Sequence, residues 1–147
     1  MYVPPYQSIL RSLKTTDSTA RDDAGITIPL GLFKMLLQIA VANSDFDEEL
    51  YFKENPDVRD AVSRGDIDSG HVHYIGFGYF EGRKGGNAID ETWYLKQYPD
   101  VAAAVRNGQV RSASDHFHQV GGGEGRSPSA DHEANAVQWK TALGRNK

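Results

Sequence analysis

Apolar and polar residues alternate along this chain mostly with the period of a helix, and no stretch shows the two-residue period typical of a strand. The longest apolar stretch begins at Pro29, which suits the first turn of a helix, and ends near Ala42. A narrow polar stripe interrupts it, formed by Gly31, Lys34 and Gln38. A helix that is apolar nearly all round must be covered on several sides. We therefore expect the segment 26–45 to hold a central core helix, a helix shared between subunits, or a helix with both roles.

The two ends of the chain carry shorter helical patterns. An amphipathic set within 6–13 predicts one short helix in an N-terminal arm, residues 1–25, whose remainder is polar and rich in turn formers. After Pro128, apolar residues recur on one face of a predicted last helix within 131–147, namely Ala136, Trp139 and Leu143. We expect this helix to cover the open end of the segment before it.

The middle of the chain is a tandem repeat. Residues 46–86 align without a gap on residues 89–129 at an offset of 43, and sixteen of the 41 paired positions are identical. The identical pairs include Pro56/Pro99, Asp57/Asp100, Val58/Val101, Gly65/Gly108, His73/His116, Glu81/Glu124, Gly82/Gly125 and Arg83/Arg126. Such a duplication indicates one structural unit used twice.

Each repeat carries the start and stop residues of three short helices. Aspartate and serine stand at predicted N-caps, proline stands between the first two helices, and glycine follows the second and third. These paired positions are Asp47/Asp90, Ser69/Ser112, Pro56/Pro99, Gly65/Gly108 and Gly78/Gly121. We therefore predict an all-α fold, in which two tandem 43-residue units, 46–87 and 88–130, pack on the hydrophobic N-terminal helix and a C-terminal helix caps them. Residues 26–147 would form a single helical domain.

Composition and charge narrow the classes of function. A chain of 147 residues is long enough to bury a core, and its lack of cysteine excludes thiol catalysis, Cys-type zinc sites and disulfides. A net charge of −4 with scattered Lys and Arg argues against a nucleic-acid partner. The apolar segment 26–42 falls short of the roughly 18 to 20 apolar residues of a transmembrane helix. Because the N-terminal residues lack the pattern of a secretory signal, we expect a cytoplasmic protein.

The paired pattern Phe/Ile-Asp-x-x-x-Tyr-x-x-x-x-Pro-Asp-Val-x-x-Ala-Val, followed by His-Tyr/Phe and Gly-x-x-Glu-Gly-Arg, resembles a known short repeat. That repeat occurs in alphaproteobacterial proteins linked to cell-surface polysaccharide, often in or beside glycosyltransferases and rhamnan-synthesis-type proteins. The resemblance covers residues 46–130 and leaves the first 45 residues outside it. It implies a context in polysaccharide production, while the chain has no room for the nucleotide-sugar-binding unit of a glycosyltransferase.

The repeated polar residues have a structural and a functional interpretation. Arg83 and Arg126 stand in glycine turns, where a guanidinium can bind an anion or a sugar, or can pair with Asp57 and Asp100. We favour the ion pair and predict that both arginines are partly buried, with Glu81 and Glu124 in the same turns. Replacing either arginine by leucine should cost roughly 2 to 5 kcal/mol if it leaves a buried acid unpaired.

Histidines and aromatic residues give two further candidates. The pairs His71/His73 and His116/His118 are spaced i, i+2, which on a helix separates the two rings, so we expect no metal site and favour hydrogen-bonded core histidines at His73 and His116. Tyr79 and Phe80 align with glycines in the second repeat. A packed core would hardly tolerate the exchange of an aromatic residue for glycine, so Tyr79 and Phe80 are candidates for an exposed patch.

Three functions remain open from the sequence. The favoured one is a non-catalytic module that acts through protein contacts as an oligomeric adaptor or regulator, with a homo-oligomer interface at Leu30, Phe33, Leu36 and Leu37. The second is a carbohydrate-binding module that would use Tyr79, Phe80, Arg83 and Arg126. The third and least favoured is a metal-dependent or other enzyme. We expect no cofactor.

Overall fold

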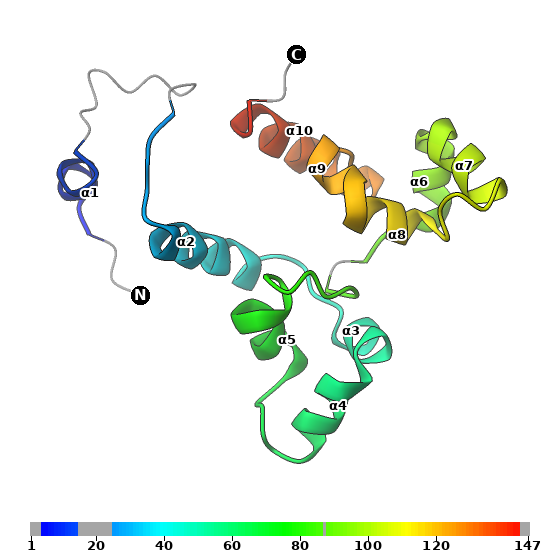
Figure 1. The fold of residues 1–147 in the computed structure, drawn as a ribbon, viewed down its shortest axis with the longest axis horizontal. Helices are drawn as coiled ribbons and strands as arrows, with labels where there is room; N and C mark the ends of the chain where they lie inside the picture. The colour runs from blue at the N-terminus through cyan, green and yellow to red at the C-terminus, as the bar shows by residue number, and fades with distance from the viewer. Residues whose placement is uncertain (1–3, 15–24, 87, 145–147) are drawn as a thin grey trace.

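The computed structural model describes residues 4–14, 25–86 and 88–144, and over these ranges every regular element is a helix. The predicted all-α fold is therefore confirmed. Figure 1 shows an extended arrangement in which α1 (Tyr6–Ser12) lies apart from the other helices and α2 (Leu30–Ala42) leads towards two groups of short helices. Most of the polar run after α1, residues 15–24, lies outside the described residues.

The first group of short helices is formed by residues of the first repeat segment, 46–87. It consists of α3 (Glu48–Glu54), α4 (Pro56–Ser63) and α5 (Gly70–His73), and α5 continues into the π-helical turn η1 (Tyr74–Gly78). The second repeat segment, 88–130, forms the same succession. Its elements are α6 (Glu91–Gln97), α7 (Pro99–Arg106), α8 (Ala113–His116), the π-helical turn η2 (Phe117–Gly121) and α9 (Gly122–Glu124).

Local signals set the helix boundaries of both segments. The carboxylates of Asp47 and Asp90 accept hydrogen bonds from the backbone N–H three residues later, each at 2.9 Å, and so cap α3 and α6. Pro56 and Pro99 occupy the first turns of α4 and α7, where a missing N–H costs nothing.

Glycine closes the second helix of each segment. Gly65 adopts a positive φ of 78°, and the N–H groups of Gly65 and Asp66 bond back to the carbonyls of Val62 and Ala61. Gly108 repeats this arrangement with a φ of 70°. This is the paired bonding of a Schellman motif, in which glycine avoids the steric cost that a Cβ would meet.

Each segment closes a small core of its own. The first core is built on Tyr51 and Val58, with Val41 from α2 and Tyr74 from η1. The second core is built on Tyr94, Val101 and Ala113. Partly buried apolar residues surround both, among them Phe46, Phe52, Val62 and Ile75 in the first and Ile89, Trp93, Tyr98 and Phe117 in the second.

The expectation of a central core helix surrounded by both repeats is wrong. The helix α2 packs against η1 of the first segment, where the Gln38 amide donates to the Ile75 carbonyl at 3.4 Å, and Val41 is its one buried residue. The physical reason is that Tyr and Val side chains already fill the core of each segment. Val41 is the one residue of α2 that joins the first core, and the other large apolar side chains of α2 lie outside it.

The C-terminal residues form η3 (Ala130–His132) and α10 (Glu133–Ala142), as predicted for this region. The helix α10 lies against the second segment, since a Cβ built on Gly125 would contact the Lys140 side chain. No residue of α10 is buried, and Trp139 and Leu143 are exposed. The helix α10 therefore contacts the surface of the second segment and contributes no side chain to its core. Among the described residues, none of the helices combines the length and the apolar character needed to span a bilayer.

Candidate functional site

A tyrosine and a histidine meet inside each repeat segment. The hydroxyl of Tyr51 on α3 lies 3.0 Å from Nδ1 of His73 at the end of α5, and Tyr94 and His116 lie at the same distance. Tyr51 and Tyr94 have no solvent exposure, and burial raises the pKa of each phenol to about 12. Neutral phenols next to imidazoles tie the first helix of each segment to the third.

Glycine makes this contact possible. A Cβ built on Gly78 would overlap the Tyr51 hydroxyl, and a Cβ on Gly121 would overlap the Tyr94 hydroxyl. Glycine therefore stands at the end of both π-helical turns because the phenol occupies the space of a side chain.

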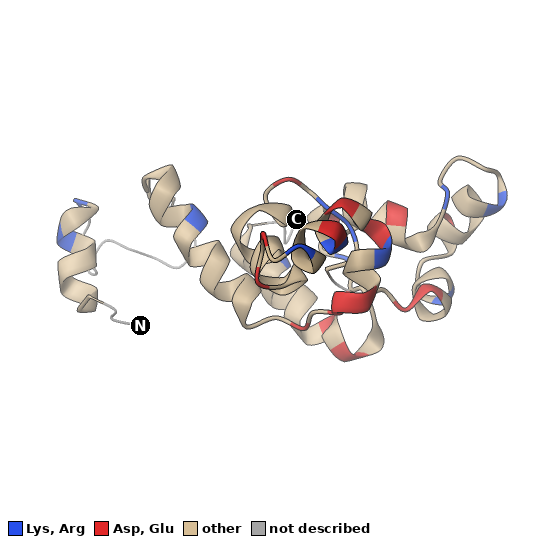
Figure 2. Ribbon diagram, turned by 90° about the horizontal axis from the view of Figure 1, so that it is seen from below, with Lys and Arg blue, Asp and Glu red and all other residues tan. Residues whose placement is uncertain are grey.

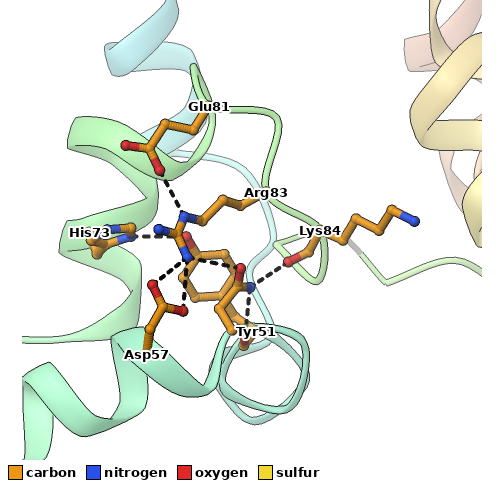
Figure 3. A network of polar contacts seen from close by, with 7 residues as sticks. Tyr51, Asp57, His73, Glu81, Arg83 and Lys84 are labelled. Atoms are coloured by element: carbon orange, nitrogen blue, oxygen red, sulfur yellow. Dashed lines mark hydrogen bonds and ion pairs between the residues drawn. The ribbon is translucent and has the colours of Figure 1, made fainter.

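An arginine lies beside each buried tyrosine and binds two carboxylates, and Figure 3 shows this arrangement for Arg83 in the first segment. In the first segment, Nη1 of Arg83 donates to the carboxylate of Asp57 at 2.7 Å, and Nε donates to Glu81 at 2.7 Å. The buried amide of Asn55 donates to the carbonyls of Tyr51 and Lys84, each at 2.8 Å, and so joins α3 to the residues that follow Arg83. The whole cluster links the Glu-Gly-Arg turn to the start of α4.

The second segment repeats the arginine cluster with a two-pronged geometry. Nη1 and Nη2 of Arg126 donate to the two oxygens of Asp100 at 3.0 and 2.7 Å, and Nε donates to Glu124 at 2.7 Å. The guanidinium also lies over the ring of Tyr98, 4.9 Å from its centroid. Hydrogen bonds from Arg126 lower the pKa of Asp100 to about 2. Hydrogen bonds from Arg83 likewise lower the pKa of Asp57.

These contacts match the structural role that the repeat pattern favours for the arginines. The side chains of Arg83 and Arg126 are partly buried, with exposed fractions of 28% and 21%. One expectation needs correction. The carboxylates of Asp57 and Asp100 are each 62% exposed, so removing the arginine leaves no buried acid behind. The cost of 2 to 5 kcal/mol expected for that case does not apply, because exposed carboxylates remain solvated.

Glutamate makes a repeated contact that the sequence patterns did not single out. Oε1 of Glu48 accepts from the backbone N–H of Gly70 at 2.7 Å, at the start of α5. Glu91 does the same for Ala113 and Ser114 at the start of α8. A carboxylate at a helix start satisfies free N–H groups. The sequence does hold one sign of this contact, because Glu48 and Glu91 are an identical pair of the repeat.

Tyr79 and Phe80 lie just after η1, at the junction with α2. Tyr79 is 37% exposed and packs edge-on against Tyr74, with ring centroids 6.0 Å apart. Phe80 is partly buried, and Nζ of Lys34 from α2 lies 5.5 Å from the centre of its ring. The two residues do not form a freely exposed pair, because α2 reaches over Phe80.

The four residues predicted for an oligomer interface lie on α2, where most of the apolar side chains face solvent. The most exposed are Leu30 at 66%, Leu36 at 50%, Met35 at 48% and Phe33 at 46%, while Leu37 is partly buried. In Figure 2 the ribbon of α2 is almost entirely tan, because Lys34 is its one charged residue. Leu30, Phe33 and Leu36 follow one another at i, i+3 and i+6 on one side of the helix, and we call these three residues the α2 face; Met35 lies about 100° further round.

Two histidines outside the tyrosine pairs also contact protein groups, while Nε2 of His71 is buried without a hydrogen-bond partner among the described residues. The ring of His71 stacks on Phe46 at 4.6 Å, and Nδ1 of His118 bonds the carbonyl of Ser114 at 2.8 Å. Over the described part of the chain, no three His, Asp or Glu side chains gather closely enough to hold a metal ion.

A pocket of about 380 Å³ lies beside the second segment, and the sequence patterns did not point to it. It lies between η2, α9 and α10. Ser44 and Asp45, in the connection between α2 and α3, also line it. Its lining includes Asp45, Phe117, Gly122, Arg126, His132, Asn135 and Trp139. At its rim, His132 bonds the Ser129 hydroxyl at 2.8 Å and the Asp45 carboxylate at 3.3 Å.

Comparisons of this chain with protein-family models, with curated proteins and with solved structures each give no match.

Proposed function

We propose that this chain is a non-catalytic helical repeat module that acts through protein contacts and self-associates through α2. The observation that carries the proposal is the α2 face, where the large apolar side chains of Leu30, Phe33 and Leu36 are about half exposed or more. Fully burying each such side chain stabilises a protein by about 1.5 to 3 kcal/mol. Exposed apolar patches of this kind mark contact surfaces in proteins.

A second copy of the chain is the occupant that suits the α2 face best. The face carries no acidic residue, and the one cation of α2, Lys34, lies over Phe80. Two copies can therefore meet with little charge repulsion. A symmetric dimer is the simplest closed assembly.

The resemblance of the repeat supplies the proposed context, an adaptor or regulator in surface-polysaccharide production. The repeated contacts Tyr51–His73 and Arg83–Asp57 hold helices together within the segment, so these polar groups serve the fold. A carbohydrate-binding module is the second candidate. The observation that favours it is the pocket beside Trp139.

Sedimentation at micromolar concentration tests the self-association. The wild-type chain should sediment as a dimer or larger species rather than as a 16.2 kDa monomer. The variants Phe33→Glu and Leu36→Glu place a charge on the α2 face and should shift the species to a monomer with unchanged helicity. A matched control is Val137→Glu on α10, which adds the same charge at another exposed apolar position and should leave the assembly intact. A monomeric wild-type chain would contradict the proposal.

A further inference from the structure

The pocket beside the second segment includes a position at which the two repeats differ. Gly122 is the counterpart of Tyr79 at the offset of 43, and Phe117 is the counterpart of Tyr74. In the first segment the Tyr79 ring packs edge-on against Tyr74. In the second segment Gly122 leaves the equivalent space beside Phe117 empty, and both residues line the pocket.

The backbone at Gly122 does not itself require glycine. Its φ of −59° is that of an ordinary right-handed helix, and a Cβ there would meet Phe117 atoms at 3.4 and 3.5 Å, which is close to ordinary contact. Gly121 and Gly125, in contrast, each require glycine. A Cβ on Gly121 would overlap the Tyr94 hydroxyl, and Gly125 has a φ of 79°. Gly122 therefore lacks the backbone reason that its neighbours have, and its effect is to keep the pocket open.

The pocket combines aromatic surface with polar groups. Trp139 lines it and is 53% exposed, and Asn135 stands one helical turn before Trp139 on α10. Arg126 already donates from Nε, Nη1 and Nη2 to Glu124 and Asp100, so its charge is compensated. At the rim, His132 is held by Ser129 and Asp45.

We propose that this pocket binds one neutral sugar ring. A pyranose has an apolar C–H face that can stack on an indole and hydroxyl groups that can bond to an amide, which is the combination that Trp139 and Asn135 offer. A volume of about 380 Å³ lies at the small end of ligand pockets, which range from about 300 to 1,000 Å³. The inference goes beyond the protein-contact role and deepens the second candidate, carbohydrate binding.

Tryptophan fluorescence can report on the pocket directly. The chain has two tryptophans, Trp93 in the second core and Trp139 in the pocket. Trp93→Leu installs the residue of the first repeat, Leu50, and leaves Trp139 as the single reporter. Titration of this variant with the methyl glycosides of glucose, galactose, mannose and rhamnose should give a saturable change for at least one of them. Cyclohexanol and the methyl glycoside of glucuronic acid serve as apolar and anionic comparison probes.

The repeat itself supplies matched variants on this background. Gly122→Tyr restores the aromatic residue of the first segment and should weaken sugar binding by more than about tenfold. Gly123→Phe restores the neighbouring residue, Phe80, at a position outside the pocket lining where a Cβ would meet nothing within 4 Å, and should change binding by less than about twofold. Asn135→Ala provides a second test that does not depend on whether Gly122→Tyr folds, and it should also weaken binding.

Several results would overturn the sugar site. They are the absence of saturation with every neutral glycoside, binding that is equal or stronger with cyclohexanol or the glucuronic acid derivative, and unchanged binding in Asn135→Ala. Because none of these measurements involves the α2 face, failure of the sugar site is distinguishable from failure of the proposed self-association, which sedimentation reports.

Discussion

The hydroxyl of Tyr51 lies 3.0 Å from Nδ1 of His73, deep in the first segment, and the same pair recurs as Tyr94 and His116. It joins a helix near the start of the segment to one near its end, across 22 residues of chain. Because Tyr51 has no solvent exposure and His73 is 9% exposed, water cannot readily replace either partner. The repeated pair is therefore a candidate for the main polar tie within each segment.

Replacing Tyr51 by phenylalanine tests this tie. Tyr51→Phe removes the hydroxyl and leaves a buried imidazole nitrogen without its partner, so we expect a loss of about 1 to 3 kcal/mol in the free energy of unfolding. Urea denaturation followed by circular dichroism measures it. Tyr79→Phe removes a phenol hydroxyl from a side chain that is 37% exposed and should change stability by less than about 0.5 kcal/mol. Equal effects of the two changes would refute the special role of the buried pair.

Adding one methyl group at Gly78 should disrupt the same contact sterically. In Gly78→Ala the new Cβ overlaps the hydroxyl of the fully buried Tyr51, so the ring or the turn must shift, and we expect a loss of about 1 to 3 kcal/mol in the free energy of unfolding. Gly76→Ala in the same π-helical turn is the control, since its Cβ would meet nothing within 4 Å. Alanine there should be neutral or slightly stabilising. Thermal melts of the two variants compare them directly, and a Gly78→Ala chain as stable as Gly76→Ala would contradict the prediction.

The Arg126–Asp100 pair should make stability depend on pH in the acid range. The folded-state pKa of Asp100 is about 2, below the ordinary value of 3.8, so its contribution is present above about pH 4 and is lost as the pH falls towards 2. Because the carboxylate is 62% exposed, we expect at most about 1 kcal/mol from it. Unfolding curves between pH 5 and pH 2 should therefore be flatter for Asp100→Asn than for wild type. Asp60→Asn, an exposed change on α4, should keep the wild-type slope, and identical slopes for Asp100→Asn and wild type would count against the pair.

The ion pair of Lys84 with Asp115 connects the two segments, and it is not part of the repeat. The carboxylate of Asp115 is only 11% exposed, and its pKa is lowered chiefly by the hydrogen bond from Lys84, with Arg111 adding to the effect. Lys84→Met leaves this nearly buried acid with only the exposed Arg111, so we expect a loss of about 1 to 3 kcal/mol.

A double-mutant cycle with Asp115→Asn isolates the coupling between Lys84 and Asp115. Lys53→Met on α3 is the control for loss of a lysine at an exposed position and should be nearly neutral. A coupling energy near zero in urea denaturation would show that the contact does not stabilise the junction of the two segments.

Local sequence signals predicted most of the helix boundaries. Asp47 caps α3, Pro56 starts α4 and Gly65 ends it, and the same residues act at the paired positions of the second segment. Each of these effects depends on backbone groups within a few residues, so the sequence alone carries the information. The pairing of Arg83 with Asp57 could also be anticipated, because both residues recur at the same offset.

Burial and the pocket were decided by the tertiary structure. The apolar pattern of α2 predicted a covered helix, yet only Val41 of α2 enters a core, because the path of the chain brings only one side of the helix to η1. The pocket forms where Gly122 lies beside Phe117 in the second segment. Its other wall includes Trp139, which lies on α10, after the repeat. The contact of Lys84 with Asp115 likewise joins residues whose repeat partners, Ser127 and Val72, carry no charge. Such relationships join distant parts of the chain, and only the path of the backbone in space brings their side chains together.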